Sequence, residues 1–246
     1  MDRLAVAASI QYAGEKLDWA TAGEWRSDRG DLENRTSWLF RTNISCEIDP
    51  SWRVLGTLDI ADSDSDAGAF FDGGFIEAAV GAAVRPVTHD KLNMLFKYTY
   101  FSDTPASGQV NGANIPVDFS QRSHILSIDA IYDLVPQLSL GAKYGLRYGQ
   151  LRTPKNTGEW FTSSAQLGVL RLDWHVVKNW DAVVEGRWLY ADAAEDQRIG
   201  ALVAVYRHVG DNMKIGVGYN FTDFSDDLTD LSYDHQGWFV NVIGKF

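Results

Sequence analysis

The feature that most constrains this chain is an alternation of apolar and polar side chains with a period of two. The alternation recurs along almost the whole sequence, in thirteen segments of about ten residues each. In the last segment, for example, Trp238, Val240 and Val242 alternate with Asn241 and Lys245. A period of two is typical of a β-strand with one apolar and one polar face, so the chain is predicted to be all-β.

The segments are joined by connections of two lengths. The alternating segments are residues 4–12, 17–25, 38–48, 52–60, 76–84, 92–100, 126–132, 138–148, 162–174, 180–190, 198–207, 213–221 and 236–246. We expect β-bulges in 162–174 and 198–207, where the phase is ambiguous. Short turns are expected at 13–16, 49–51, 86–90, 133–137, 177–179 and 208–212, and longer polar loops at 27–36, 62–72, 102–118, 153–159, 191–197 and 223–233. Short turns at one end and long loops at the other are typical of a transmembrane β-barrel.

A soluble β-sandwich is the alternative, and strand length and aromatic placement argue against it. Sandwich strands average five or six residues, whereas a strand that crosses a bilayer at a tilt needs about nine to eleven. The aromatic residues form two belts, as expected at two membrane interfaces. The belt at the short-turn end holds Tyr12, Trp52, Tyr132, Trp174, Trp180, Tyr206 and Phe246, and that at the long-loop end holds Trp25, Trp38, Tyr98, Tyr100, Tyr148, Trp160, Trp188 and Tyr219.

Composition excludes several other classes. The net charge of −11 argues against a nucleic-acid-binding surface, which needs clustered Lys and Arg. No apolar run reaches the roughly 18 residues of a spanning helix, so a helical membrane protein is excluded. The single cysteine, Cys46, cannot form an internal disulfide and is interpreted as a small apolar residue. The first residues lack the basic and apolar regions of a signal peptide, so we expect any export signal to have been removed.

Two stretches carry a resemblance to a family. GWFVNVIGKF, residues 237–246, resembles the carboxyl-terminal signature strand of bacterial outer-membrane proteins, which the barrel assembly machinery is thought to recognise. YRHVGDNMKIGVGYNFTDFSDDLTDLSYDHQGWFVNVIGKF, with RSHILSIDAIYDLVPQLSLGAKYGLRYG upstream, is similar to the terminal barrel region of large, poorly characterised proteobacterial outer-membrane proteins, from about Thr36 onward. The resemblance implies location in a Gram-negative outer membrane, contact with membrane lipid and lipopolysaccharide, and an assembly signal formed by Trp238, Val240, Val242 and Phe246.

The expected architecture is a closed antiparallel transmembrane β-barrel with short periplasmic turns and long extracellular loops. A carboxyl-terminus at the periplasmic end of an even-numbered barrel leaves one of the thirteen segments without a partner. We therefore expect residues 17–246 to form a barrel of about 12 strands and residues 1–16 to be an incomplete strand or an excision remnant. A barrel of 14 strands is the alternative.

The polar phase supplies the candidate lumen residues, among which basic side chains outnumber acidic ones. They are Arg41, Arg53, Asp59, Glu77, Arg85, Lys97, Asp129, Lys143, Arg147, Glu185, Arg187 and Lys214. One interpretation is a water-filled pore that favours anions. The other, which we favour for the majority of these charges, is pairing across neighbouring strands inside a narrow lumen.

Metal binding and catalysis have weaker support. Asp62, Asp64 and Asp66 have the spacing of the first ligands of an EF-hand loop, but Ala67 and Gly73 stand where that loop needs Gly and Glu. No nucleophile, base or metal cluster can be identified by spacing, since Asp234 and His235, the best acid–base candidates, are adjacent on a strand. We therefore predict no enzyme activity and no cofactor. Two functions remain: a porin-like passive channel for small solutes, narrow and anion-preferring, or a structural membrane anchor or translocation domain of a larger surface protein.

Overall fold

The fold is described from a computed structural model of the chain. The structure describes residues 2–31, 33–68, 71–106, 118–210, 212–224, 228 and 236–244. These residues group into two units, which are treated separately below. Unit 1 comprises Met1–Ala83, Lys97–Leu126 and Tyr148–Ser163, and unit 2 comprises Val84–Phe96, Ser127–Arg147 and Ser164–Phe246.

Thirteen strands make up the described secondary structure, apart from one short 3-10 helix, η1. The strands are β1 (Asp2–Ala13), β2 (Leu17–Arg29), β3 (Asn34–Asp49), β4 (Trp52–Ser65), β5 (Gly73–Val84), β6 (Leu92–Thr104), β7 (Ser120–Val135), β8 (Leu138–Arg152), β9 (Phe161–Val177), β10 (Trp180–Ala191), β11 (Asp196–Val209), β12 (Met213–Asn220) and β13 (Gly237–Gly244), and η1 is Asp192–Ala194. Among the described residues, no helix is long and apolar enough to cross a membrane.

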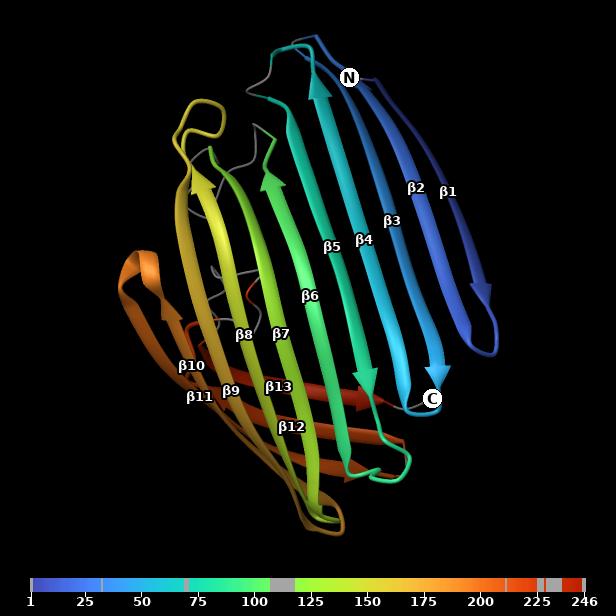
Figure 1. The fold of residues 1–246 in the computed structure, drawn as a ribbon, viewed down its shortest axis with the longest axis vertical. Coiled ribbons are helices and arrows are strands. Elements are labelled where there is room, and N and C mark those ends of the chain that lie inside the picture. The colour runs from blue at the N-terminus through green and yellow to red at the C-terminus, as the bar shows by residue number, and fades with distance from the viewer. Residues whose placement is uncertain are drawn as a thin grey trace. The chain divides into compact units, whose positions relative to one another are not determined.

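The strands are ordered in the sheet as they are in the sequence, from β1 to β13, and Figure 1 shows successive strands joined as hairpins. This confirms the all-β prediction and the thirteen segments. Among the described residues β1 pairs with β2 and β13 with β12, and each stands at an end of the strand order. Closure into a barrel of about 12 or 14 strands therefore stays a prediction. Residues 2–13 pair with β2 along twelve positions as a regular strand of the same sheet. That residues 1–16 are an incomplete strand or an excision remnant stays a prediction.

The connections follow the expected alternation of length only in part, since 85–91 has seven residues whereas 30–33 and 192–195 have four each. We call the end of the strands that carries the connections 14–16, 50–51, 85–91, 136–137, 178–179 and 210–212 the short-turn end, and the other the long-loop end. At the long-loop end the strands run further than the alternation predicted, since β2 reaches Arg29 and β4 reaches Ser65. Backbone hydrogen bonding continues there although the side chains no longer alternate in polarity.

The register of β2, β3 and β4 in unit 1 gives the sheet two chemically different faces. Trp19 lies opposite Ile44, Trp25 opposite Trp38, and Phe40 opposite Ile60, so apolar side chains share one face, the apolar face. Arg41 opposite Asp59, Asn43 opposite Thr57 and Glu47 opposite Arg53 lie on the other, the polar face. The apolar face is solvent-accessible in the isolated chain: Ile44 is 45% and Trp52 45% exposed. This arrangement is the reverse of a soluble domain, which buries its apolar face.

Unit 2 repeats the two faces with one change of phase. Val184, Val203, Val217 and Val240 lie on the apolar face, while Ala204, Tyr206 and Gly216 share the face of Val183 and Asp181. Tyr206 therefore lies on the polar face, whereas the sequence analysis placed it with the apolar phase in the short-turn aromatic belt. It is buried with Val183 and Ala204, against Leu202 and Phe239.

Two irregularities interrupt the ladders that join β1 to β4 and β9 to β13, and they only partly match the expected bulges. A register shift lies where Trp180 and Asp181 face Val177 and His175, just beyond the 162–174 segment, and another lies at 47–49. Residues 196–207 pair with β10 without a shift, so the bulge that we expected there is absent from this ladder. The phase of β11 was ambiguous because ALVAVY is apolar on both faces.

Candidate functional site

The polar face of β3 and β4 carries ion pairs between neighbouring strands. Arg41 Nε lies 3.1 Å from Asp59 Oδ1, and Arg53 Nη2 lies 3.2 Å from Glu47 Oε2. Both pairs are partly exposed, so each contributes at most about 1 kcal/mol to stability. Three of the candidate lumen residues are thus held in pairs.

A denser network occupies the polar face of β9 and β10 in unit 2. Arg187 Nε donates to Glu185 Oε1 at 2.5 Å, and both side chains are nearly buried. Arg171 donates to Asp173 from Nε and Nη2 at 2.8 Å, and its Nη1 lies 4.0 Å from Glu185 Oε2. Glu185 therefore sits between two guanidinium groups, which offsets the cost of burying its charge.

The remaining candidate lumen residues are distributed over the two units. Glu77 lies in β5, Lys97 in β6, Asp129 in β7, and Lys143 and Arg147 in β8, whereas Arg85 directly follows β5 in a connection. Whether these side chains line an aqueous lumen stays a prediction.

Arg147 anchors the connection between β12 and β13. Its Nη1 donates to the backbone oxygen of Leu228 at 3.2 Å. Phe224 and Leu228 in this connection are 1% and 3% exposed, so both side chains are buried. Arg147 in β8 is therefore held by a residue of this connection, a contact that the alternation does not predict.

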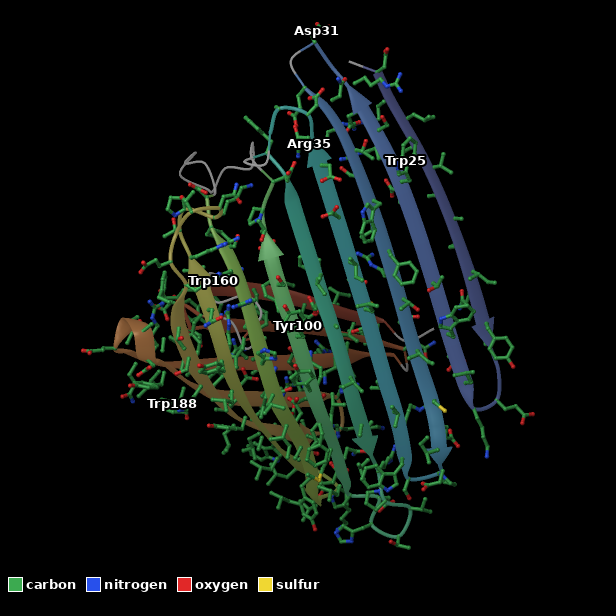
Figure 2. The ribbon with its side chains drawn as sticks, turned by 45° about the horizontal axis from the view of Figure 1, so that its top comes forward. Trp25, Asp31, Arg35, Tyr100, Trp160 and Trp188 are labelled. Carbon is green, nitrogen blue, oxygen red and sulfur yellow. The ribbon has the colours of Figure 1, made fainter. Side chains whose placement is uncertain are left out.

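A cavity of about 370 Å³ lies in unit 1 near the long-loop end, where β2, β3 and β4 approach the start of β5 and the end of β6. Its polar lining includes Glu24, Arg26, Arg35, Ser37, Ser63 and Asp103. Arg26 Nε is 3.2 Å from Asp28 Oδ2 but is buried without a well-formed hydrogen bond to the described residues. Figure 2 shows Arg35 on β3, near the connection that carries Asp31. The cavity can offer both guanidinium donors and carboxylate acceptors to a small polar ligand.

Carboxylates tie the connections beside this cavity together. Glu33 Oε1 accepts hydrogen bonds from Ser65 Oγ at 2.7 Å and from Arg35 Nη2 at 2.6 Å. These bonds lower the pKa of Glu33 below its ordinary value. Asp66 accepts from the backbone N and Nδ2 of Asn34 at 2.8 and 2.7 Å, and these bonds likewise lower its pKa.

This geometry bears on the acidic run that resembled a calcium loop. Asp62 and Asp64 are part of strand β4, opposite Trp38 and Thr36, instead of lying in a connection. Asp66 is engaged by Asn34. The three carboxylates therefore do not form the loop that their spacing suggested.

Lys155 holds three connections of unit 1 together. It is fully buried, and its Nζ donates to the backbone oxygens of Asp72 at 2.8 Å and Pro105 at 2.9 Å. Its backbone N donates to Asp118 Oδ1 at 2.9 Å. Burial lowers the pKa of the Lys155 ammonium, and the nearby Asp118 and Asp72 carboxylates oppose that effect.

A cluster that the sequence analysis missed lies at the short-turn end of unit 2. Asp181 Oδ1 lies 2.6 Å from His175 Nδ1, and Oδ2 lies 2.9 Å from His208 Nε2 and is also contacted by Lys214 Nζ. His175, Asp181 and His208 could together hold a metal ion, because their ligating atoms all lie within 4.8 Å of one another. In the part of the chain that the structure describes, no other three His, Cys, Asp or Glu side chains come this close together. Two imidazoles and a carboxylate suit a transition metal ion, but the Lys214 ammonium already neutralises the carboxylate.

A sequence signal for this cluster exists in hindsight. His175 and Asp181 flank the 178–179 turn, and His208 and Lys214 face each other across the 210–212 turn. His208 and Lys214 are equidistant from their turn and therefore meet on one face. His175 faces Asp181 because of the register shift at Trp180 and Asp181, which the alternation does not reveal. Linking the two pairs needs the register between β10 and β11, which the alternation left ambiguous.

The assembly-signal residues lie in β13 as far as the structure describes them. Trp238, Val240 and Val242 lie on the apolar face and are 78%, 74% and 61% exposed. Phe246 lies outside the described residues, as do Asp234 and His235. The role of this segment in assembly stays a prediction.

Comparisons with known proteins concern the fold. No protein-family model and no curated protein sequence matches the chain. Among solved structures, it is similar to the siderophore receptor PirA from Pseudomonas aeruginosa, with a TM-score of 0.64 and 9% identity over 89% of this chain and 41% of that one. It is also similar to P. aeruginosa FpvA bound to heterologous pyoverdines, with a TM-score of 0.64 and 8% identity over 100% of this chain and 45% of that one. For the copper transporter OprC the TM-score is 0.53 and the identity 12%, over 89% of this chain and 44% of that one.

These similarities define the class of fold: an antiparallel sheet like that of the β-barrels of outer-membrane receptors and transporters. At these identities they define the fold alone. The chain spans less than half the length of each of the three proteins.

Proposed function

We propose that the chain forms part of the wall of a solute-transporting β-barrel in the outer membrane of a Gram-negative bacterium. Its apolar face lies toward lipid and its polar face toward the aqueous lumen. The observation that carries the proposal is the register of β2 to β4. It gathers exposed Trp, Ile and Phe side chains on one face and ion-paired Arg, Asp and Glu side chains on the other. Lipid is the surrounding that makes an exposed apolar face favourable, because it removes that face from water.

Paired cysteine labelling tests the orientation. In a Cys46→Ser background, Asn43→Cys and Ile44→Cys place a thiol on opposite faces of β3 at neighbouring, exposed positions. We expect a water-soluble maleimide to label the full-length protein at position 43 in outer-membrane vesicles, and a lipid-soluble maleimide to label it at position 44. Equal labelling of both positions by the water-soluble reagent, with the protein in the soluble fraction, would contradict a membrane location.

Within this class, we favour a barrel that binds its solute over a wide passive pore. Two features support binding: the cavity near the long-loop end of unit 1, with Arg26 and Arg35 in its lining, and the connection that Arg147 holds in unit 2. A small polar solute that carries anionic groups would pair with the arginines. The similar structures include proteins named as a siderophore receptor and a copper transporter, and we propose uptake of a small solute here by the same kind of fold.

A passive, anion-preferring porin is the second candidate, and the excess of basic over acidic side chains among the candidate lumen residues favours it. A structural anchor or translocation domain is the third. Planar-bilayer recordings of the full-length protein purified from outer membranes separate them. Steady conductance with anion preference would support the porin. A silent wild-type protein that binds a solute, with binding lost on Arg35→Gln, would support the receptor, and a silent protein that binds none would support the anchor.

A further inference from the structure

One side-chain cluster on the apolar face is used by none of the roles above. It lies in unit 1 at the long-loop end of β7 and β8, and we call it the arginine–tryptophan cluster: Arg122, Arg152, Trp160 and Gln150. The guanidinium carbons of Arg122 and Arg152 lie 4.5 and 4.7 Å from the centre of the Trp160 ring. Figure 2 shows Trp160 at that end of the sheet.

The cluster lies on the face that we assign to lipid. Along β7, Arg122 and His124 continue the phase of exposed Leu126, and along β8, Gln150 and Arg152 continue the phase of exposed Tyr148. Next to them, Tyr98 Oη lies 2.7 Å from His124 Nδ1 and Tyr100 packs against the same ring at 5.3 Å. On this face the strands therefore change from apolar, through aromatic, to basic side chains as they approach the long-loop end. A membrane interface has the same order of acyl chain, glycerol or sugar region, and charged headgroup.

The two guanidinium groups are held in place but are not neutralised. Arg122 donates from Nε and Nη2 to Gln150 Oε1 at 2.9 and 2.7 Å, and both arginines stack on the indole ring. Within the described residues no carboxylate lies within 4.0 Å of either guanidinium, unlike Arg41, Arg53, Arg171 and Arg187. Arg152 Nε is buried and makes no hydrogen bond there.

Two neighbouring arginines that contact no carboxylate among the described residues can bind an anion from outside the chain. Guanidinium groups bind phosphate through parallel hydrogen bonds, and stacking on Trp160 reduces the entropy lost on binding. We propose that the arginine–tryptophan cluster binds the phosphate group of an anionic outer-leaflet lipid, such as a phosphorylated glycolipid, whose acyl chains lie along Leu126 and Tyr148. The proposal rests on the membrane orientation proposed above.

Retention of lipid by the purified protein tests the site. Native mass spectrometry of the full-length protein in mild detergent would count the bound phosphorylated glycolipid in the wild type and in the double variant Arg122→Gln/Arg152→Gln. The control is Arg41→Gln, which removes an exposed arginine from the polar face instead. We expect retention to fall at least tenfold in the double variant and to be unchanged in Arg41→Gln. Equal retention in all three proteins, or an equal loss in both variants, would overturn the proposal.

A fluorescence titration distinguishes a lipid headgroup from a free anion. Mixed micelles that contain phosphorylated glycolipid should change the emission of the wild type but not of Trp160→Phe, whereas phosphatidylcholine micelles and inorganic phosphate should change neither. A response to inorganic phosphate as strong as that to the glycolipid would identify a soluble-anion site and refute a lipid site. The Arg122→Lys/Arg152→Lys variant keeps both positive charges and should keep part of the wild-type fluorescence response, whereas Arg122→Gln/Arg152→Gln should lose it. The Lys variant therefore still tests the site if the Gln variant does not fold. The cysteine labelling of Asn43 and Ile44 decides the orientation separately.

Discussion

At the scale of single residues, polar groups in the connections carry much of the order at the long-loop end. Lys155, Glu33 and Asp66 each join segments that are distant in sequence, through hydrogen bonds of 2.6 to 2.9 Å. A buried donor or acceptor that loses its partner costs about 1–3 kcal/mol. Small changes at these residues should therefore open the connections and leave the strands intact.

Replacing Lys155 by Met should loosen the connections that it joins. Met keeps much of the side-chain volume but leaves the Asp72 and Pro105 carbonyls without their donor. A loss of about 1–2 kcal/mol raises the open population by a factor of about 5–30. The measurement is the rate of limited proteolysis within residues 153–160. The control is Lys178→Met, in the exposed turn between β9 and β10, and equal rates in both variants would contradict the role of Lys155.

The ties made by Glu33 and Asp66 should weaken in acid. Each carboxyl has a lower pKa in the folded protein than the ordinary values of 4.5 and 3.8. Its contribution is therefore complete above those values and is lost as the pH falls through the folded pKa. Hydrogen exchange at the Asn34 amide, corrected for its intrinsic rate, should show constant protection from pH 8 to about 5 and declining protection in stronger acid. In Asp66→Asn that decline should be reduced, and an unaltered decline would show that another group controls it.

At the scale of the strands, the alternation predicted the number of strands and nearly all turns, because a period of two is a local property of the sequence. It failed where both phases are apolar, as in β11, and where strands continue with polar side chains, as at Asp62 and Asp64. The candidate sites were harder to predict. Cross-strand pairs such as Arg41 with Asp59 follow from hairpin symmetry, whereas the Lys155 contacts and the Arg147–Leu228 bond depend on how the connections fold, which no periodicity describes.

The contact between Tyr206 in β11 and Gly216 in β12 gives a test of the register of these two strands. A Cβ added at Gly216 would overlap the ring of Tyr206, whereas one added at Gly186 meets no atom within 4 Å. We expect Gly216→Ala to destabilise the protein by about 1–3 kcal/mol through overpacking, and Gly186→Ala to change stability by less than about 0.5 kcal/mol. Urea unfolding in lipid vesicles measures both. Tyr206→Leu should recover part of the loss in Gly216→Ala, and an additive double variant would argue against the contact.

At the scale of the whole molecule, the question is whether the polar face encloses a permanently open path. Paired charges and the hydrogen bond from Arg147 to Leu228 in the β12–β13 connection argue for a restricted one. The strand order ends at β1 and β13, and the similar structures are more than twice as long as this chain. The pore diameter is therefore a property to be measured on the full-length protein.

Displacing the β12–β13 connection should increase the conductance of the protein. Phe224→Asp places a charge at a buried position, and we expect the cost of burying that charge to displace the connection. Planar-bilayer recordings should then show a conductance several times that of the wild type. Phe221→Asp, at a position that is 52% exposed in the same connection, is the matched control. Equal conductance in wild type, variant and control would mean that this connection does not restrict the path.

The burial of Lys155 also makes it a chemical reporter. An amine-reactive reagent cannot reach its Nζ while the Asp72 and Pro105 carbonyls hold it inside the protein. Acylation at this position can proceed only as fast as the three connections separate. The modification rate of Lys155, followed by peptide mass mapping in intact cells, would therefore record how often the three connections at the long-loop end of unit 1 separate. It would also record whether a bound solute keeps them together.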